Sequence, residues 1–532
     1  WVGELYLEIH RGTYTSMARN KKYNRKSEFA LMDAELYSIM DKTVLNGEYR
    51  QAEINDMWRT VLLNQFHDIL PGSSIKEVYE VSKEQYENVL SGADSIKKNA
   101  LSNIAKNINA PSDGFAVFNQ LGFTRSELVE IDNADNFENP VVTASDGTVS
   151  NAQKVGDKLL FYAENVPSKG YKTYTVAEGK PAESEIFVSE HRMSNRFFDI
   201  EIDKNGNISS IYDKRAERNV LKGTGNVFQA FEDKPKDYDA WEISVYYQQK
   251  MWEVNDFCGA EVIENGTERG ILRIKRKFVN SEIVQDICIY KNIDRIDFKT
   301  KIDWKEKHIL LKTAFPVDVH TSKATYEIQF GNVERPTHWN TSWDMAKFEV
   351  CAQKWADISE DGYGVSLLND CKYGHDIKDG VMRLTLIKSA TYPNPDADKD
   401  LHEFTYSLYP HKDTWREANT VDMAYSLNCP LSCAPVAKNG GTLPCEFSFI
   451  ETDCKNVVVE TVKKAEDSGD IIVRMFECQN RRGKVNAVMF KDILNAAECD
   501  LLENETEKVQ FDKNTFTFEI KPYEIKTFKI KL

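Results

Sequence analysis

The sequence predicts a multidomain α+β protein that is mainly β, with a three-helix bundle followed by antiparallel β-sandwich domains. Three observations predict it: the length, a helical period near the start, and alternating strands over the rest. At 532 residues the chain is too long for one hydrophobic core and should divide into roughly three or four domains. A hydrophobic content of 41% beside 29% charged residues is typical of a soluble globular protein.

Residues 24–110 have the periodicity of three amphipathic helices. The first carries one apolar stripe and ends at the turn signal Asn46-Gly47. The third begins after Pro71, where Ser74 and Glu77 have the spacing of a capping box, and continues for about 30 residues. Short connections predict antiparallel neighbours in a bundle. The second helix has a buried stripe at Ile54, Met57, Trp58, Val61 and Leu62.

The chain after Pro111 has the pattern of antiparallel sheets. Alternating strands are predicted over residues 271–278, 283–290 and 296–304, and the turn Lys204-Asn205-Gly206 indicates a hairpin. Strands without intervening helices favour β-sandwiches. We therefore predict a small β domain over residues 111–182, a large β-sandwich over 183–430 and a C-terminal β domain over 431–532.

Charge and cysteine usage exclude several classes of protein. The net charge of −16 argues against a nucleic-acid-binding protein, which needs a basic face. We expect no membrane association, because no apolar run approaches the ~18 residues of a spanning helix and no signal pattern opens the chain. Ten scattered cysteines predict free thiols in a reducing, cytoplasmic compartment. A zinc site at Cys429, Cys433, Cys445 and Cys454 is the weaker alternative, since no C-x-x-C spacing occurs.

A His-Asp pair follows the second predicted helix. At about 100° per residue, Thr60, Asn64 and His67 share a polar face of that helix. On chemistry alone, His67 and Asp68 suit a metal site, an acid/base pair, or a histidine that holds a loop by hydrogen bonds. The last is the commonest use of an isolated histidine.

The string Gln65-Phe66-His67-Asp68-Ile69-Leu70-Pro71-Gly72-Ser73 resembles the His-Asp motif of the glycoside hydrolase family 38 α-mannosidases. The resemblance implies that His67 is a zinc ligand and that Asp68 touches the sugar. It also implies a retaining enzyme that releases terminal α-linked mannose from oligosaccharides. Its Asp nucleophile and its other zinc ligands, one His and two Asp, would lie in an N-terminal catalytic domain missing from this sequence. One histidine cannot hold zinc, so we expect a fragment with an incomplete zinc site and no activity.

Residues 1–16 resemble the segment that closes the catalytic α/β domain in the bacterial and cytosolic members, and we predict a remnant of that domain over residues 1–23. Period two places Glu4, Tyr6, Glu8 and His10 on one face of an extended segment. We expect Tyr6 to bind substrate and Glu8 to be the proton donor. A solvated edge strand is the alternative.

Four strings in the β half extend the resemblance, near residues 231–241, 334–344, 368–374 and 404–411. In this family a loop of the large sandwich reaches the active site, and we expect Asp370 and Tyr373 to bind the sugar. Turns and domain contacts are the alternative for such strings. The pairs His375-Asp376 and His411-x-Asp413 are interpreted as a loop pair and a surface turn.

Two rival functions share this composition. One is a noncatalytic carbohydrate-binding or scaffolding protein, and the other is a related hydrolase for a different sugar. A native start near Trp1 would favour the first. The sequence leaves both a monomer and a homodimer open.

Overall fold

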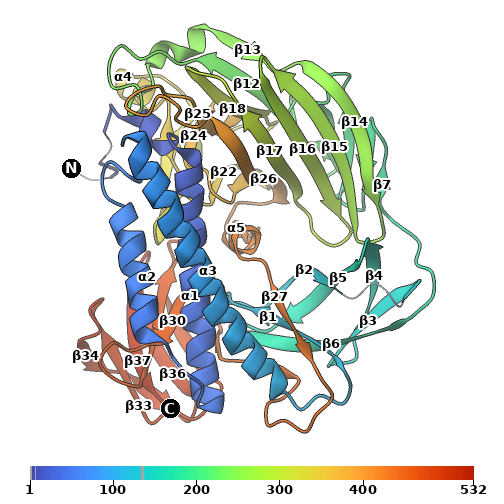
Figure 1. The fold of residues 1–532 in the computed structure, drawn as a ribbon, viewed down its shortest axis with the longest axis vertical. Helices are drawn as coiled ribbons and strands as arrows, with labels where there is room; N and C mark the ends of the chain where they lie inside the picture. Colours follow the sequence, from blue (N-terminus) through green and yellow to red (C-terminus); the bar gives the residue numbers. More distant parts are fainter. Residues whose placement is uncertain (1–2, 6, 133–136) are drawn as a thin grey trace. The chain divides into compact units, whose positions relative to one another are not determined.

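The structure is a computed structural model that describes residues 3–5, 7–132 and 137–532 (Figure 1). It is mostly β, with antiparallel sheets and few helices, which confirms the predicted fold class. The described chain forms two compact units that are both assembled from separate segments. Unit 1 falls within residues 1–26, 62–87 and 183–428, and unit 2 within residues 27–61, 88–182 and 429–532. No helix among the described residues is long and apolar enough to cross a membrane.

Three long helices occupy the stretch where the sequence predicts them: α1 (Ala18–Leu45), α2 (Gln51–Asn64) and α3 (Lys76–Lys106). In unit 1, the carboxylate of Asp398 accepts hydrogen bonds from the amides of Met17 at 2.8 Å and Ala18 at 2.7 Å, and these two bonds cap the start of α1. In unit 2, α1 ends before Asn46, which has a left-handed φ of 59°. The predicted stop at Asn46-Gly47 is therefore confirmed.

Unit 1 contains three antiparallel sheets (Figure 1). Five strands run in the order β11-β10-β9-β8-β7, six in the order β13-β12-β18-β25-β24-β21, and nine in the order β14-β15-β16-β17-β26-β23-β22-β19-β20. Their common core is aromatic and aliphatic, and Phe298 stacks on Tyr406 with ring centroids 5.0 Å apart. Strands predicted from alternation at 271–278, 283–290 and 296–304 correspond to β15, β16 and β17.

The bounds of these strands are β7 (Phe187–Val188), β8 (Arg192–Ser194), β9 (Phe198–Ile202), β10 (Ile208–Asp213), β11 (Arg218–Asn219), β12 (Val227–Glu232), β13 (Met251–Glu253), β14 (Asp256–Asn265), β15 (Arg269–Phe278), β16 (Ser281–Tyr290), β17 (Ile296–Trp304), β18 (Ile309–Pro316), β19 (Lys323–Ile328), β20 (Gly331–Pro336), β21 (Val350–Cys351), β22 (Trp355–Glu360), β23 (Tyr363–Asn369), β24 (Gly374–Lys378), β25 (Val381–Lys388) and β26 (Asp400–Lys412). Short helices of the same unit are η1 (Arg11–Tyr14), η2 (Val245–Gln249), α4 (Ser342–Met345) and α5 (Thr420–Asn428).

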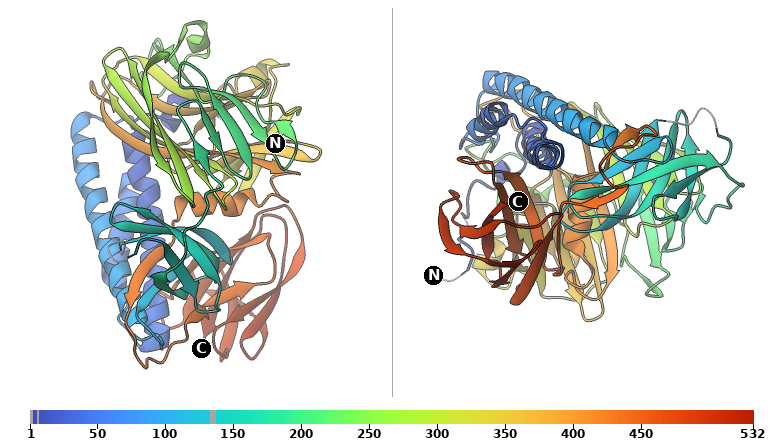
Figure 2. Two further views of the ribbon diagram at one scale, coloured as in Figure 1. Left: turned by 90° about the vertical axis from the view of Figure 1, so that its right-hand side faces the viewer. Right: turned by 90° about the horizontal axis from the view of Figure 1, so that it is seen from below.

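Unit 2 also contains three antiparallel sheets, and the last two carry the C-terminal strands drawn in red (Figure 2). Seven strands run in the order β2-β5-β4-β3-β6-β1-β27, with β28 paired to β6. The others run β29-β32-β36-β35 and β30-β31-β37-β33-β34. The bounds are β1 (Gly114–Asn119), β2 (Arg125–Asp132), β3 (Pro140–Ala144), β4 (Val149–Val155), β5 (Lys158–Val166), β6 (Gly170–Glu178), β27 (Ser432–Val436), β28 (Glu446–Ser448), β29 (Ile450–Thr452), β30 (Val457–Lys464), β31 (Ile471–Glu477), β32 (Gly483–Met489), β33 (Asn495–Cys499), β34 (Glu505–Lys508), β35 (Gln510–Asp512), β36 (Thr515–Ile520) and β37 (Ile525–Lys531).

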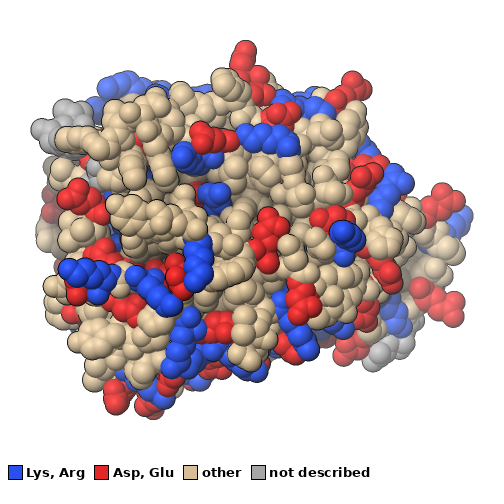
Figure 3. All heavy atoms as spheres, turned by 90° about the horizontal axis from the view of Figure 1, so that it is seen from above, with Lys and Arg blue, Asp and Glu red and all other residues tan. Residues whose placement is uncertain are grey.

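The surface of the face shown in Figure 3 mixes basic and acidic side chains without a large area of one sign. The net charge of −16 is therefore not gathered into a single acidic patch on that face. Such a mixed face gives no long-range attraction for a polyanion.

Candidate functional site

His67 and Asp68 lie in the turn between α2 and α3, in unit 1. The helix α2 ends at Asn64, so His67 lies three residues beyond it and not on its polar face. The shared helical face predicted for Thr60, Asn64 and His67 is therefore wrong. Asn64 itself is buried, and its side-chain amide donates to Gln85 at 2.8 Å. This bond joins the end of α2 to α3 and leaves the histidine to the turn.

The carbonyl oxygen of Asp68 organises the turn. It accepts hydrogen bonds from the Ser73 amide at 3.2 Å, the Ser74 hydroxyl at 2.9 Å and the Tyr79 hydroxyl at 3.2 Å. The Asp68 carboxylate accepts a further bond, at 2.9 Å, from the Ser73 hydroxyl. The predicted capping box of Ser74 with Glu77 is wrong, because the Ser74 amide donates to the Tyr79 hydroxyl at 3.0 Å and α3 begins at Lys76, which leaves Ile75 as the residue before the helix.

The turn is also anchored to the start of α1. Gly72 has a φ of +92°, and a Cβ at this position would lie 2.2 Å from the carbonyl oxygen of Ser16. The ammonium group of Lys21 donates to the carbonyl oxygens of Ser16 at 2.5 Å and Leu70 at 2.9 Å. Burial lowers the pKa of Lys21 to about 7. The backbone around His67 is thus fixed by several bonds that do not involve its ring.

The His67 ring projects into solvent from this fixed backbone. Its side chain is 75% exposed, that of Asp68 is 46% exposed, and the Nε2 atom of His67 lies 3.5 Å from an Asp68 carboxylate oxygen. The surroundings are apolar although exposed, since Leu62, Leu63, Phe66 and Ile75 each leave more than half of their surface open. Such a surface is typical of one that another part of a protein covers. An exposed imidazole next to a carboxylate can donate to a metal ion or to a sugar hydroxyl.

The described residues do not complete a metal site. Within them, no group of three or more His, Cys, Asp or Glu side chains is placed to hold one ion. Zinc sites in proteins need about four ligands, and catalytic ones at least three from protein. His67 and Asp68 can therefore supply part of such a site.

The N-terminal segment does not form the predicted strand. Residues 3–5 and 7–10 lie outside any strand, and His10 has a left-handed φ of 63°. Glu4 pairs with Arg335 at 2.6 Å, and although partial burial opposes it, this guanidinium holds the pKa of Glu4 below its usual value. The His10 ring bonds to Glu242 at 2.7 Å. The expected common face is wrong for these residues because each binds its own partner on the sandwich.

Glu8, the predicted proton donor, is exposed in this segment. Tyr6, the predicted substrate contact, lies outside the described residues. Neither prediction is tested by these positions, and both stay predictions.

Asp370 and Tyr373 lie next to α1. The Asp370 carboxylate is 3.4 Å from the ammonium group of Lys26 and accepts the Thr405 amide at 3.1 Å. Although burial opposes it, the field of Lys26 holds the pKa of Asp370 below its usual value. The Tyr373 hydroxyl accepts a bond from Arg25 at 3.1 Å, and the guanidinium carbon lies 4.3 Å from the centre of its ring. Their predicted contact with sugar stays a prediction, and the structure adds a role in holding the sandwich to α1.

Sequence reasoning missed Lys21 and Arg25, which hold the turn and the 369–373 loop. The sequence hid this pair, because the first helix was predicted only from about residue 24, and the observed start at Ala18 is what places Lys21 four residues before Arg25 on one helical face. Both are buried.

The histidines set aside as surface features are in fact buried. His411 lies in β26, and its Nε2 is 2.8 Å from Asp357, with both side chains at most 2% exposed. His375 and Asp376 lie in β24 and are also buried. The predicted surface turn and loop pair are wrong, because the partners come from strands far away in sequence.

Comparison with known proteins places three segments of the chain in related family models. These are the alpha mannosidase middle domain over residues 8–104, the glycosyl hydrolases family 38 C-terminal domain over 193–396, and the family 38 C-terminal beta sandwich domain over 456–528. Among solved structures, an alpha-mannosidase from Enterococcus faecalis V583 superposes with a TM-score of 0.81. The match has 17% sequence identity and covers 98% of this chain and 68% of that one, so it shows a common fold.

Curated relatives are more similar in sequence. Alpha-mannosidase G of Dictyostelium discoideum is 33% identical over 99% of this chain and 52% of its own length. Alpha-mannosidase 2C1 of Homo sapiens is 33% identical over 94% of this chain and 48% of its own length. The chain thus spans about half the length of the curated relatives that it matches. With family models matching its helical segment and both of its main β regions, the chain belongs to glycoside hydrolase family 38.

Proposed function

We propose that this chain supplies the middle and C-terminal parts of an α-mannosidase that hydrolyses terminal α-linked mannose in oligosaccharides. One observation carries the proposal: His67 and Asp68 lie exposed on a rigid turn, inside the segment that matches the α-mannosidase middle domain. A histidine kept only for packing would be buried, as His411 is. The matched relatives named above are α-mannosidases, which supports the same activity here.

In this proposal His67 is a zinc ligand, and the remaining donors come from a part of the protein outside these residues. The donor set fits zinc, since imidazole nitrogen and carboxylate oxygen are both common zinc ligands. Zinc would supply a template for the sugar hydroxyls when bound. The chain itself contributes orientation: the hydrogen bonds of Asp68 and Lys21, and the close packing of Gly72 against Ser16, hold the backbone so that the ring points outward.

The carboxylates have separate roles in the proposed retaining reaction, which needs two carboxyl groups about 5–5.5 Å apart. We assign Glu8 as the proton donor and place the nucleophile outside this chain. One Asp68 oxygen is held by Ser73, and the other lies on the His67 side, where it can accept a sugar hydroxyl. Tyr6, Asp370 and Tyr373 complete the proposed sugar contacts. The chain alone would bind zinc weakly and hydrolyse nothing.

All ten cysteines lie within the described ranges and are free thiols. We place the protein in the cytoplasm on this basis, since reducing compartments keep thiols free. A homodimer stays a proposal, and size measurement in solution tests it.

The test is His67→Ala in the protein encoded by the complete gene. The expected result is loss of zinc and at least a roughly thousandfold loss of nitrophenyl α-mannoside hydrolysis, because the site loses a ligand. His191→Ala removes another exposed histidine and is the matched control. Unchanged zinc content and turnover in the His67 variant would contradict the proposal, and so would robust turnover by residues 1–532 alone.

A further inference from the structure

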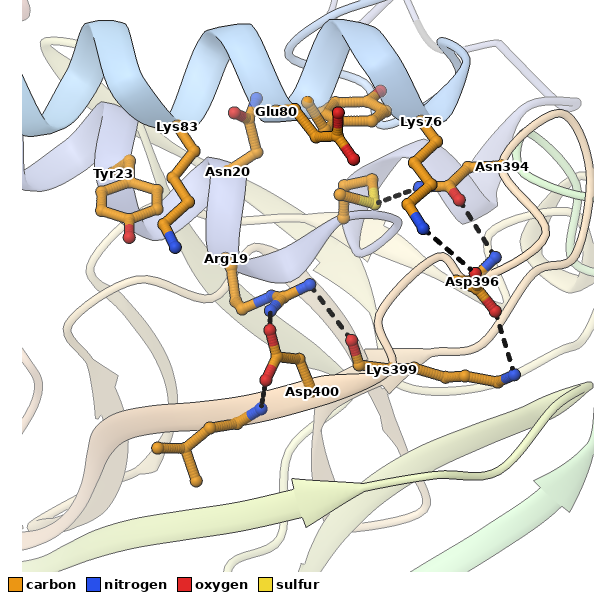
Figure 4. Close-up of a pocket in the computed structure, with 13 residues that line it drawn as sticks. Arg19, Asn20, Tyr23, Lys76, Glu80, Lys83, Asn394, Asp396, Lys399 and Asp400 are labelled. Carbon is orange, nitrogen blue, oxygen red and sulfur yellow. Dashed lines mark hydrogen bonds and ion pairs between the residues drawn. The ribbon is translucent and has the colours of Figure 1, made fainter.

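Unit 1 contains a polar pocket that the proposed reaction does not use. It has a volume of about 530 Å³ and lies between α1, α3, the loop before β26 and the start of β26. Pockets of this size hold small ligands. Figure 4 shows Lys76, Glu80 and Lys83 extending from α3 toward Arg19, Lys399 and Asp400 on the opposite wall. The helical residues lie on one face because they are spaced by three and four positions.

The charges of the lining are nearly balanced. The basic members are Arg19, Lys76, Lys83 and Lys399, and the acidic members are Glu80, Asp396 and Asp400. Most are already paired within the wall. Lys76 and Lys399 lie 3.5 and 3.2 Å from Asp396, and Arg19 forms an ion pair with Asp400. A ligand with a net positive or net negative charge would therefore be repelled by side chains of the same sign. A neutral ligand would find hydrogen-bond donors and acceptors side by side.

Glu80 is the acidic member that the wall leaves without an ion pair among the described residues. Its carboxylate can accept two hydrogen bonds from a ligand. Lys83, across one turn of α3, has only a loose pairing with Glu87 at 3.8 Å, and its side chain is 60% exposed. An acceptor and a donor on one helix turn match adjacent hydroxyl groups of a sugar ring.

Aromatic and apolar side chains complete the pocket. Tyr23 is stacked on Tyr86 with an angle of 9° between the rings, which fixes its orientation. Tyr79, Met17 and Leu401 add apolar surface. Flat rings beside paired hydrogen-bonding groups are the arrangement that an amphipathic sugar requires, since one face of the sugar is apolar and its edge is polar.

We propose that this pocket is a second carbohydrate-binding site, which takes one or two neutral sugar units and is distinct from the His67 site. The ligand class follows from the lining, and only the choice of mannosides as probes rests on the proposed function. The pocket and the His67 turn share Tyr79, whose ring lines the pocket and whose hydroxyl bonds to the carbonyl oxygen of Asp68. Tyr79 is therefore a positioning residue for the turn.

The experiment measures binding of methyl α-mannoside and an α-linked mannobiose by calorimetry. It uses the His67→Ala form of the full chain, in which the proposed catalytic site is damaged. Binding is expected to persist there, to weaken about tenfold or more in Glu80→Ala, since a charged hydrogen bond is lost, and to vanish in Glu80→Trp, which fills the pocket. Glu84→Trp, an exposed residue one turn along α3 and outside the lining, should bind like the parent.

Three results would contradict the proposed second carbohydrate-binding site. These are no sugar binding by the His67→Ala form, equal loss in Glu80→Trp and Glu84→Trp, or binding of inorganic phosphate in place of the sugars. Circular dichroism of each variant shows whether it has folded, and Glu80→Ala keeps the test meaningful if the tryptophan variant has not. Absent mannosidase activity with retained sugar binding would refute the proposed function and leave the pocket standing.

Discussion

Two His-Asp pairs in unit 1 have the same chemistry and opposite settings. His67 and Asp68 are exposed on a turn, at 75% and 46% of their side-chain surface. His411 and Asp357 are at most 2% exposed, and Asp357 also accepts bonds from Ser359 at 2.6 Å and Ser366 at 2.8 Å. The buried pair has every partner it needs within the fold. The exposed pair is held by its backbone, which leaves its side chains available for a ligand.

The largest expected effect is a difference in the free energy of unfolding between variants of the buried pair and variants of the exposed pair. Asp357→Ala should lower the free energy of unfolding by about 3–5 kcal/mol, because it leaves His411, Ser359 and Ser366 without their buried acceptor. Asp68→Ala should cost about 1 kcal/mol or less, since its side chain accepts one bond at a half-exposed position. Urea unfolding measures both. Comparable losses would remove the distinction between the pairs.

Acid should act on the buried histidines of unit 1. Burial lowers the pKa of His375 to about 4 and that of His402 to about 3. The unfolded chain binds these protons near pH 6.5, so it holds more protons than the folded chain between that pH and the folded pKa values. Each neutral imidazole therefore contributes its full stability above pH 6.5. That contribution is lost as the pH falls toward 4 for His375 and toward 3 for His402. The free energy of unfolding should fall by about 3 kcal/mol or more for each residue.

Urea midpoints at pH 7 and pH 5 test this loss. His375→Asn should reduce the difference between the two midpoints. His191→Asn, which replaces an exposed histidine, is the control and should leave that difference unaltered. An equal pH response in both variants would contradict the assignment to burial.

The backbone of the exposed pair should be sensitive at Gly72. Gly72→Ala should cost about 2–3 kcal/mol and reduce the proposed mannoside turnover, because an added Cβ strains a φ of +92° and meets the Ser16 carbonyl at 2.2 Å. Gly147→Ala is the matched control. Gly147 has a φ of +87° with no atom within 4 Å of the added Cβ, so its cost should be only the roughly 1 kcal/mol of the backbone strain. Equal costs would show that the contact with Ser16 is not important.

The smallest effect concerns Tyr79. Tyr79→Phe keeps the ring and removes the hydroxyl that bonds to Asp68 and Ser74, so it should cost about 1 kcal/mol. Sugar binding in the pocket should change less than about twofold, since the ring that lines it remains. Tyr86→Phe removes another buried hydroxyl, bonded to Asn24, and is the control. A loss of the proposed mannosidase activity is expected only in the Tyr79 variant.

Local patterns predicted the helices and the strands well, because apolar spacing reports which face is buried. The start of α1 shows where this fails. The sequence placed it near residue 24, but it begins at Ala18, since Asp398 caps it from 380 positions away. The sequence near residue 18 gives no local signal that Asp398 is its partner.

The candidate site shows the same division. The His67 string was visible as a motif, and its role as a ligand stays a prediction. The burial of His411 could not be predicted from the sequence, because its partners Asp357 and Ser366 lie on other strands. The polar lining around Glu80 was equally hidden, since it joins residues from three distant segments.

The interleaving of the two units has a consequence for biosynthesis. In unit 2, Leu36 and Ile39 belong to the same hydrophobic cluster as Phe516 and Ile530. A ribosome must release the chain as far as Ile530 before that cluster can close, so Leu36 and Ile39 stay uncovered while the residues between them and Ile530 are made. Contacts of such long sequence separation form slowly. The nascent protein should depend on molecular chaperones, and truncation of its final strands should send the product toward aggregation.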